Sequence, residues 1–536
     1  METAEVDYLI IGAGMAGTVL HRFLQHDSVA ILDPRPAGYK IGESIIPEHF
    51  LHPELRQLVP KAKQLPSYAP KFGVMFVCDG SVASFPLPAH GADAAMHVAR
   101  SELEALMHQE WQTPVVRERV TDVQLSDRIV VTDQRQYKVR RQIIDCSGPA
   151  MVVARHCAQI DRLWPVWARW AYLDIEAIQD DAFWSHLRNN DMEYRRFDVP
   201  NGQLLPAEED PDWRPSRNTI LTQIAPGIWT WQIPLYDHAI LSFGVVSRHG
   251  MPTEEDLFAA ATKHAAPHYR LRRRSPSEHW LDRIHTRCNF ARMANPIATD
   301  DYILLADAAG FADPVYSVGT GLAVNKAIEL ASVLNEEGWN PTTRDRYIAD
   351  HTQLFDRAFK AFDTWYTGEV MTNDAAAREV QSGFLMGTAF QVGIAQQYSR
   401  VLADAGPAQL EGEGEVPGRH QIDPTATPLT EAVRDLLTLS AEQTLAGWQL
   451  TGAYRTPTEV QHRWSRDGMP ELVVNTSFDP ANTRYYRRIG DISLSFMNLW
   501  DREYPMDASC VALFDALEDR IAAATDAWHA LAQATH

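Results

Sequence analysis

The sequence has few cysteines, and they follow no pattern. Five are scattered over 536 residues without the Cys-x-x-Cys spacing of zinc and redox sites. An odd, scattered set supplies neither a disulfide framework nor a zinc site, and it is typical of a reducing compartment. We therefore expect a cytoplasmic protein without a bound metal. The five are Cys78, Cys146, Cys157, Cys288 and Cys510.

Long apolar runs are missing as well. No run approaches the roughly 20 residues of a membrane-spanning helix. No charged start leads into an apolar segment, as it does in a secretory signal. We expect no membrane partner, and no internal repeat is evident. A chain of 536 residues with 45% apolar content is expected to be a globular enzyme of two or three domains.

Positive charge is scarce. The chain carries 49 basic and 70 acidic side chains, which leaves a net charge of −21. This balance disfavours binding to DNA, RNA or anionic membranes, so we expect no nucleic-acid partner. The basic run at residues 270–274 is most simply a solvated helix end, and a docking patch for an acidic partner is the alternative.

The strongest pattern that is present is a glycine-rich turn. An apolar run at residues 7–11 leads into it, a helical pattern follows, and a second apolar run at 29–32 ends at Asp33. Gly12 permits a tight turn, Gly14 lets the backbone approach a pyrophosphate, and Gly17 allows close helix packing. The helix start offers N–H groups to phosphates, and Asp33 would hold ribose hydroxyls. The sequence thus predicts a dinucleotide site at Gly12, Ala13, Gly14, Met15, Ala16 and Gly17.

A second pattern is Trp-Thr-Trp-Gln-Ile-Pro at residues 229–234. Trp229 and Trp231 are two residues apart, so a β-strand places both indoles on one face, and Pro234 is expected to end the strand. Paired indoles suit the wall of a flat ligand or a sealed channel, while an ordinary half-buried strand is the alternative. Neighbouring strand-like runs between residues 165 and 250 predict an antiparallel sheet.

Three polar segments precede these strands. Glu43 and Ser44, in Gly-Glu-Ser-Ile-Ile-Pro at residues 42–47, are placed to cap a helix. Lys71 stands just before a strand-like run, where a lysine usually extends its ammonium to water. Arg100 is followed by a capping box of Ser101 and Glu104, and a surface ion pair with Glu104 is its simplest role.

The fingerprint, the Gly-Glu-Ser-x-x-Pro segment and the paired tryptophans together resemble the flavin-dependent halogenases. The likeness covers residues 5–335 and is greatest to the branch acting on phenols, pyrroles or carrier-bound acyl groups. It implies an α/β fold with a Rossmann-type FAD-binding domain like those of glutathione reductase and p-hydroxybenzoate hydroxylase. An antiparallel substrate sheet would occupy about 160–290 within a core of residues 1–365. Beyond the likeness, the helical spacing of apolar residues in 366–405 is the basis for expecting residues 366–536 to form a mainly helical domain over the substrate entrance.

The resemblance also assigns roles to residues. Lys71 matches the essential lysine that passes an electrophilic halogen to the substrate, and the amides of Val318 and Gly319 match the halide site. The tryptophans would help keep the peroxyflavin from hydroxylating the substrate directly. The flavin contacts it implies are Gly42, Glu43 and Ser44 in a mobile strap, Arg100, Asp307 at the ribityl chain, and Pro314, Gly319, Thr320 and Gly321. In this pattern Ala306 replaces a glycine, and Tyr316 replaces the glutamate of tryptophan halogenases.

The activity so implied is FADH2- and O2-dependent chlorination or bromination through a C4a-hydroperoxyflavin and hypohalous acid. A separate reductase would supply FADH2, and the substrate would be a small molecule or be bound to a carrier protein. An FAD-dependent aromatic hydroxylase using NAD(P)H is the alternative. A catalytically silent subunit that binds flavin or a carrier protein is a third possibility, against which Lys71 speaks.

Overall fold

The computed structural model describes residues 2–50, 52–78, 81–86, 95–198, 203–206, 214–265, 267–315, 317–349 and 351–352. It also describes 420–421, 449–455, 459–466, 469–479, 484–489 and 492–493. Residue contacts divide the chain into two compact units, one of residues 1–197 and 204–389 and one of residues 198–203 and 390–536. The expected boundary at residues 365–366 lies outside the described residues.

The fingerprint folds as predicted. β1 (Thr3–Ile11), α1 (Met15–Phe23) and β2 (Val29–Leu32) follow one another along the chain. Residues 8–11 are buried and apolar, as expected for a strand covered on both faces. The seven-stranded sheet has the order β8 (Val115–Val116), β2, β1, β11 (Gln136–Asp145), β10 (Ile129–Thr132), β9 (Val120–Gln124), and β22 (Tyr302–Leu304) pairs with β11. The pairs of β1, β2, β8, β11 and β22 are parallel, and β10 and β9 add an antiparallel edge.

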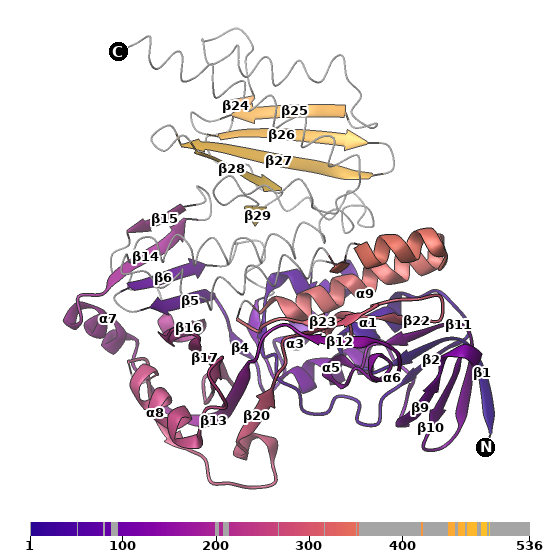
Figure 1. The fold of residues 1–536 in the computed structure, drawn as a ribbon. Helices are drawn as coiled ribbons and strands as arrows, with labels where there is room; N and C mark the ends of the chain where they lie inside the picture. Colours follow the sequence, from indigo (N-terminus) through magenta and orange to yellow (C-terminus); the bar gives the residue numbers. More distant parts are fainter. Residues whose placement is uncertain are drawn as a thin grey trace. The chain divides into compact units, whose positions relative to one another are not determined.

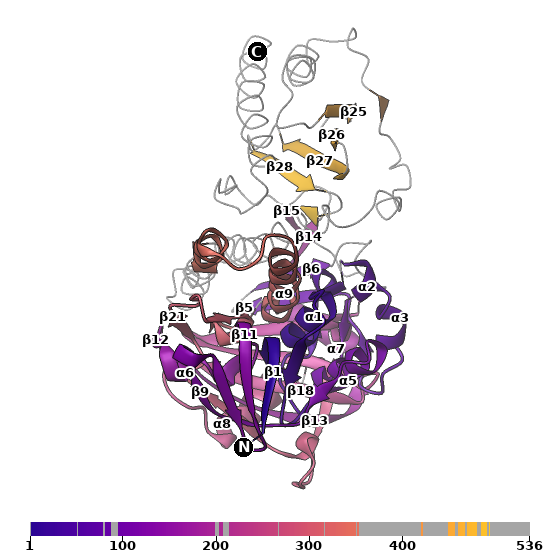
Figure 2. The same ribbon diagram turned by 90° about the vertical axis from the view of Figure 1, so that its right-hand side faces the viewer.

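Two helices from distant parts of the sequence lie together beside this sheet. α9 (Val318–Glu336) runs alongside α1, and the views in Figures 1 and 2 agree on this. α5 (Arg100–Glu110) also contacts α1. Because helices begin at the carboxyl ends of the parallel strands, the starts of α1 and α9 face the same region.

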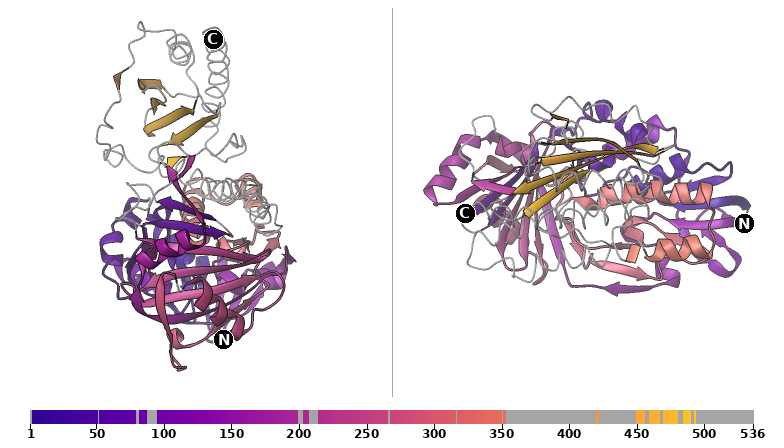
Figure 3. Two further views of the ribbon diagram at one scale, coloured as in Figure 1. Left: turned by 90° about the vertical axis from the view of Figure 1, so that its left-hand side faces the viewer. Right: turned by 90° about the horizontal axis from the view of Figure 1, so that it is seen from above.

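A second, ten-stranded sheet holds the tryptophan strand, and Figure 3 shows it from two further sides. Its order is β15 (Gln203–Pro206), β14 (Glu193–Asp198), β6 (Ser81–Pro86), β5 (Gly73–Cys78), β16 (Asn218–Ala225), β17 (Ile228–Leu235), β18 (Ile240–Ser247), β13 (Trp167–Ile178), β19 (Tyr269–Arg273), with β20 (His285–Cys288) on β13. The predicted antiparallel sheet is confirmed for β16, β17, β18 and β13. However, β5 and β6 join it from residues 73–86, and the pairs β16–β5 and β14–β6 are parallel, so the sheet is mixed.

Helices bury apolar side chains against this sheet. α8 (Glu254–His264) packs Leu257 and Phe258 against Phe243 and other residues of β18 and β13. α7 (Asp180–Asn189) packs Phe183 and Trp184 against residues of β5, β6 and β16.

Two small sheets complete the first unit. β3 (Ser44–Ile45), β7 (Met96–His97) and β4 (Ala69–Pro70) form one, in which Ser44 lies opposite His97. β12 (Gln159–Arg162), β21 (Arg292–Asn295) and β23 (Gly310–Phe311) form the other. The first sheet brings the segment of Glu43 and Ser44 next to the loop that carries Lys71.

The second unit corrects a prediction. Its described residues form a six-stranded antiparallel sheet, not helices: β24 (His420–Gln421), β25 (Gln449–Arg455), β26 (Glu459–Arg466), β27 (Met469–Asp479), β28 (Arg484–Ile489) and β29 (Ile492–Ser493). Alternating residues such as Val460, His462 and Trp464 carry the period of a strand, which the helical interpretation overlooked. The remaining residues of the predicted helical region, including 366–405, lie outside the described residues.

Two local predictions are also wrong. The basic run at 270–274 is strand β19 and its end, not a helix end, and it pairs with acids of β13: Arg272 Nη2 lies 2.7 Å from Asp174 Oδ2. Ser101 and Glu104 form no capping box, because α5 has no side-chain cap and Glu104 turns into the protein interior. A capping box does occur at the start of α8, where it is formed by Thr253 and Asp256. The sequence analysis did not predict it.

Three sequence-based expectations concern absent features. No helix within the described residues is long and apolar enough to cross a membrane. The same residues contain no cluster of three or more metal-ligating side chains. Cys146, Cys157 and Cys288 are free thiols.

Candidate functional site

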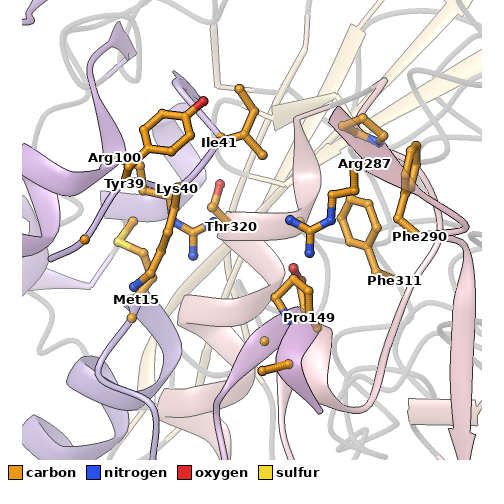
Figure 4. Close-up of a pocket in the computed structure, with 18 of the residues that line it drawn as sticks. Met15, Tyr39, Lys40, Ile41, Arg100, Pro149, Arg287, Phe290, Phe311 and Thr320 are labelled. Atoms are coloured by element: carbon orange, nitrogen blue, oxygen red, sulfur yellow. The ribbon is translucent and has the colours of Figure 1, made fainter. Parts of the chain in front are cut away.

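The first unit contains a cavity of about 940 Å³ between the two large sheets. Figure 4 shows part of its wall, with Arg100 and Lys40 on one side and Arg287 and Phe311 on the other. The predicted site residues that line it are Gly12, Gly14, Met15, Ala16, Asp33, Gly42, Glu43, Ser44, Arg100, Trp229, Trp231, Asp307, Pro314, Gly319 and Thr320. The structure therefore brings together segments separated by more than 300 residues. Ala13, Gly17, Lys71, Pro234, Val318 and Gly321 do not line the cavity.

The turn before α1 needs its glycines for steric reasons. Gly12 has φ +103°, and a Cβ there would lie 2.5 Å from the carbonyl oxygen of Cys146. A Cβ on Gly17 would lie 1.9 Å from the carbonyl oxygen of Gly12. Both obstacles are backbone atoms, which cannot move away as a side chain can. Gly17 therefore acts from behind the cavity by letting α1 pack against the turn.

Carboxylates surround the start of α1. Asp33 accepts hydrogen bonds from the backbone N–H groups of Ala13 (3.0 Å) and Arg35 (2.8 Å), which fixes its carboxylate at the cavity edge. Glu104 is fully buried and accepts from the amide of Met15 at 3.3 Å. It also pairs with Lys40 (2.6 Å) and Arg100 (3.0 Å). Arg100 thus makes the expected ion pair with Glu104, although the pair is largely buried and not on the surface, and Arg100 also lines the cavity.

The start of α9 offers backbone amides to the cavity. Ser317 precedes it at φ +57°, and no side chain caps the helix. Its first N–H groups lack intrahelical acceptors, and the positive end of the helix dipole favours an anion there. Of the predicted halide ligands, Gly319 lies on the cavity wall and Val318 does not.

His49, which the sequence analysis did not single out, forms a hydrogen bond with the hydroxyl of Thr320. Burial lowers the pKa of His49 to about 3, so its ring is neutral at ordinary pH. Its Nδ1 lies 2.8 Å from the carbonyl oxygen of Ile46 and therefore carries the ring proton. Nε2 is then an acceptor, and Thr320 donates its hydroxyl to it. An anion at this helix start is left with the backbone amides as donors.

Arginines gather around Asp307. Ala306 adopts φ +55°, so an alanine stands in the left-handed conformation that favours glycine. Burial raises the pKa of Asp307, while Arg100, Arg287 and Arg292 oppose this shift. Among the described residues Arg287 makes no ion pair, and burial lowers the pKa of its guanidinium. Figure 4 shows this guanidinium pointing into the cavity, where it is placed to bind an anionic group.

The tryptophan strand behaves as predicted on its cavity side. Trp229 and Trp231 lie with ring centroids 6.0 Å apart, and both line the cavity. Trp170 of β13, 6.0 Å from Trp231, extends the aromatic wall. Pro234 does not end the strand, because β17 continues to Leu235 paired with β18. Proline has no backbone N–H to donate, but this costs no bond to β16, because the pairing of β17 with β16 ends at Gln232.

Gly244 provides the space for Trp231, and this gives a first prediction. The two residues lie opposite each other on β18 and β17, and a Cβ on Gly244 would lie 2.2 Å from the indole carbons. Gly244→Ala is expected to displace the indole and to lower the free energy of unfolding by about 1–3 kcal/mol, measured by denaturant titration. In a Trp231→Ala background the same substitution should cost little. Equal costs in both backgrounds would contradict the predicted collision.

Lys71 is buried behind the cavity wall. It is 1% exposed, and its Nζ donates a hydrogen bond to Ser44 Oγ at 2.8 Å. Ser44 Oγ also lies 2.8 Å from Thr219 Oγ1, which in turn lies 2.9 Å from His97 Nε2. Because Ser44 and Thr219 line the cavity, this network connects the ammonium with its interior. The snorkelling lysine that the local sequence favours is therefore wrong.

The sequence interpretation missed much of the aromatic and basic wall. Trp280 stacks on Tyr39 at 5.0 Å, and His285 stacks on Trp170 at 5.4 Å. Arg287 lies two residues after His285 on β20. The alternation of His285 and Arg287 with exposed residues was a strand signal, but nothing in it indicated a cavity.

Comparisons with known proteins bear on the fold. No model of a protein family matches the chain, and neither does any curated protein. A flavoprotein/dehydrogenase structure from Cytophaga hutchinsonii aligns with a TM-score of 0.54 at 21% identity over 74% of this chain and 95% of that one. The flavin-dependent brominase Bmp2 aligns with 0.51 at 17% over 72% and 94%, and the halogenase PltM with 0.51 at 18% over 73% and 80%. The chain thus has the α/β fold of FAD-dependent halogenases and related flavoproteins, which confirms the predicted class for the first unit.

Proposed function

We propose that the chain is an FADH2- and O2-dependent halogenase that chlorinates or brominates an electron-rich aromatic or otherwise activated carbon. The observation that carries this proposal is the fully buried ammonium of Lys71, bonded to Ser44 on the wall of a nucleotide-type cavity. A lysine that only supported a surface strand would extend to water. A desolvated amine is instead suited to hold or transfer an oxidised halogen.

The cavity residues fit FAD. Gly12, Gly14 and the start of α1 would face the pyrophosphate, and Asp33, held by two amides, would bind the ribose hydroxyls. Arg287, which makes no ion pair among the described residues, supplies a positive charge for an anionic part of the cofactor. The reduced flavin, when bound, supplies the activation of O2 that oxidises a halide.

The remaining roles fall to other residues of the cavity and its wall. The amides at the start of α9, near Gly319, would hold chloride or bromide, since His49 engages the Thr320 hydroxyl. Trp229 and Trp231 would exclude water and keep the substrate apart from the cofactor. Lys71, bonded to Ser44 in the cavity wall, would deliver the halogen to the substrate carbon.

The source of reduced flavin is also part of the proposal. The sequence holds one dinucleotide fingerprint in a strand–helix–strand context, and this fingerprint is assigned to FAD, not to NAD(P)H. We infer that a separate reductase supplies FADH2, and that the substrate is a small molecule or is presented by a carrier protein. The alternative is an aromatic hydroxylase that reduces its own FAD with NAD(P)H, because that class shares the fold.

One experiment separates the two activities. Purified protein is incubated with FADH2, O2 and candidate phenols, pyrroles or carrier-bound acyl groups, with chloride, bromide or neither, and products are analysed by mass spectrometry. A halogenase gives a halide-dependent product carrying the chlorine or bromine isotope pattern. A hydroxylase gives the same oxygenated product with or without halide and oxidises NAD(P)H in the absence of a reductase.

Arg287→Gln gives a second prediction. Because this guanidinium has no ion pair among the described residues, its removal should weaken FAD binding about tenfold, as measured by isothermal titration. The unloaded protein should keep its fold, since the substitution breaks no ion pair among the described residues, although it removes one of three arginines that favour the charged form of Asp307. Arg272→Gln, at a 64% exposed side chain on β19, is the matched control and should leave FAD binding unchanged. Equal effects of both variants would exclude the role of Arg287.

A further inference from the structure

Lys71 begins a chain of three hydrogen bonds that ends at His97. Lys71 Nζ donates to Ser44 Oγ at 2.8 Å, and Ser44 Oγ lies 2.8 Å from Thr219 Oγ1. Thr219 Oγ1 in turn lies 2.9 Å from His97 Nε2. Each of the four side chains is at most 5% exposed. The small sheet fixes their spacing, because Ser44 and Ala69 lie opposite His97 on the two strands that flank β7.

The donors of this chain point in one direction. An ammonium can only donate, and Ser317 Oγ donates to Ser44 Oγ as well, at 3.1 Å. Both lone pairs of the Ser44 oxygen are then used, so its own proton is directed to Thr219. Thr219 therefore donates its single proton to Nε2 of His97. Because Nε2 accepts a bond, the ring proton of His97 lies on Nδ1.

The imidazole at the end of the chain is neutral. Burial, together with the nearby charge of Lys71, keeps the pKa of His97 well below its usual value. Its Nδ1 has no hydrogen-bond partner among the described residues. A buried donor without a partner costs on the order of 1–3 kcal/mol, so an apolar side chain would serve packing alone at less cost. The bond that Nε2 accepts is what explains a histidine at this position.

We propose that His97 is a positioning residue for Lys71, because its Nε2 accepts the proton of Thr219 and thereby turns the oxygen of Ser44 toward the ammonium. Aligned hydrogen bonds strengthen one another, so the chain stabilises the charged form of Lys71 and holds Nζ against the cavity wall. His97 does not line the cavity and acts through two hydroxyls that do. The inference rests on the proposed function for the reaction that Lys71 performs, but not for the charge in which Lys71 is held.

Other titratable and charged groups surround Lys71. Burial lowers the pKa of the two further histidines among them, and burial raises that of the carboxyl to about 7. Since His97 and Thr219 are uncharged, replacing them by apolar residues removes hydrogen bonds and leaves all of these charges in place. A change in the titration of Lys71 in such variants therefore reports the hydrogen-bonded chain. The surrounding groups are Glu43, His49, Arg100, Arg217 and His238.

The test titrates Lys71 by carbon-13 NMR of the full chain labelled at lysine, without cofactor or substrate. The sequence has eight lysines, so few signals need to be resolved, and Lys71→Ala identifies the signal by its absence. His97→Leu removes the terminal acceptor, so the pKa of Lys71 should fall by about one unit. His97→Gln offers an amide oxygen as acceptor and should restore most of this fall.

Thr219→Val breaks the same chain one bond earlier. It should lower the pKa of Lys71 at least as much as His97→Leu does, and because valine has the shape of threonine it tests the chain even where His97→Leu does not fold. The double variant should fall no further than Thr219→Val alone, since both substitutions act through one chain. Equal pKa values of Lys71 in the wild type, His97→Leu and Thr219→Val would overturn the proposal.

His268→Leu is the matched control. His268 is 3% exposed, its Nδ1 also has no partner among the described residues, and its ring stacks on Phe183 of α7. It has no bond to the chain of Lys71, so the variant should leave the pKa of Lys71 unchanged. A fall as large as that in His97→Leu would show a general effect of losing a buried imidazole and would exclude the positioning role.

Kinetics then separate this proposal from the proposed function. With an active substrate, the limb of the pH–rate profile that Lys71 sets should move to lower pH in His97→Leu by the same interval as the NMR midpoint. If the NMR midpoints shift as described but no halide-dependent product forms, the proposed function fails and the positioning of Lys71 by His97 stands. If product forms while the NMR midpoint is the same in the wild type and both variants, halogenation stands and the role of His97 is wrong.

Discussion

Lys71→Ala should lower halogenation about 100-fold or more while leaving FAD affinity unchanged. The loss follows because the substitution removes the only part of the Ser44 network that carries an amine, and single groups that stabilise a transition state contribute on this scale. The affinity should persist because Lys71 does not line the cavity. Product formation measured by mass spectrometry and FAD binding measured by titration check the two parts separately.

Lys40→Ala supplies the matched control. Lys40 lines the cavity and pairs with Glu104 beside the amide of Met15, so this variant should weaken FAD binding. Its product formation should recover when FADH2 is in excess. Normal halogenation by Lys71→Ala, at any FADH2 concentration, would remove the observation that carries the proposed function.

Gly17→Ala is the second substitution with a large expected effect. The new Cβ would lie 1.9 Å from the carbonyl oxygen of Gly12, and neither backbone segment has room to move, because Gly12 itself lies against Cys146. We expect the free energy of unfolding to fall by about 1–3 kcal/mol or more, and FAD affinity to fall at least tenfold. Denaturant titration and FAD titration measure the two effects.

Gly14→Ala, in the same turn, distinguishes packing from ligand contact. A Cβ on Gly14 would meet only the ends of flexible side chains, Lys40 Nζ at 3.2 Å and Glu104 Oε1 at 3.4 Å. The variant should therefore fold with near-normal stability, yet bind FAD more weakly because the methyl group occupies the cavity wall. If Gly14→Ala were the less stable of the two, the packing role assigned to Gly17 would be refuted.

Local patterns predicted the parts of the fold whose cause is local. The glycines of the fingerprint specify a turn by their sterics, and period-two alternation in residues 228–235 specifies a strand with both indoles on one face. The C-terminal unit shows the limit of the approach. Its strands β25 to β28 contain charged and polar residues on both faces, so the alternation seen at Val460, His462 and Trp464 was overlooked.

Charged side chains were predicted less well, because their partners are remote in sequence. Glu104 is a good capping residue by position, yet it turns inward because Lys40 and Arg100 neutralise it there. Arg272 and its neighbours belong to an edge strand because acids of β13 lie beside them. Arg100 lies one turn before Glu104 on the same helix, but Lys40 and the acids of β13 come from other segments, which the local sequence does not indicate.

The sequence by itself determined that a dinucleotide-type turn, a tryptophan-lined strand and a lysine occur in one chain with the fold of flavoproteins. Only the tertiary structure decided that Lys71 is buried behind Ser44 and that Arg287 lines the cavity without an ion pair among the described residues. Turns and strands follow from neighbouring residues. Burial and charge depend on side chains that the fold brings together from distant segments.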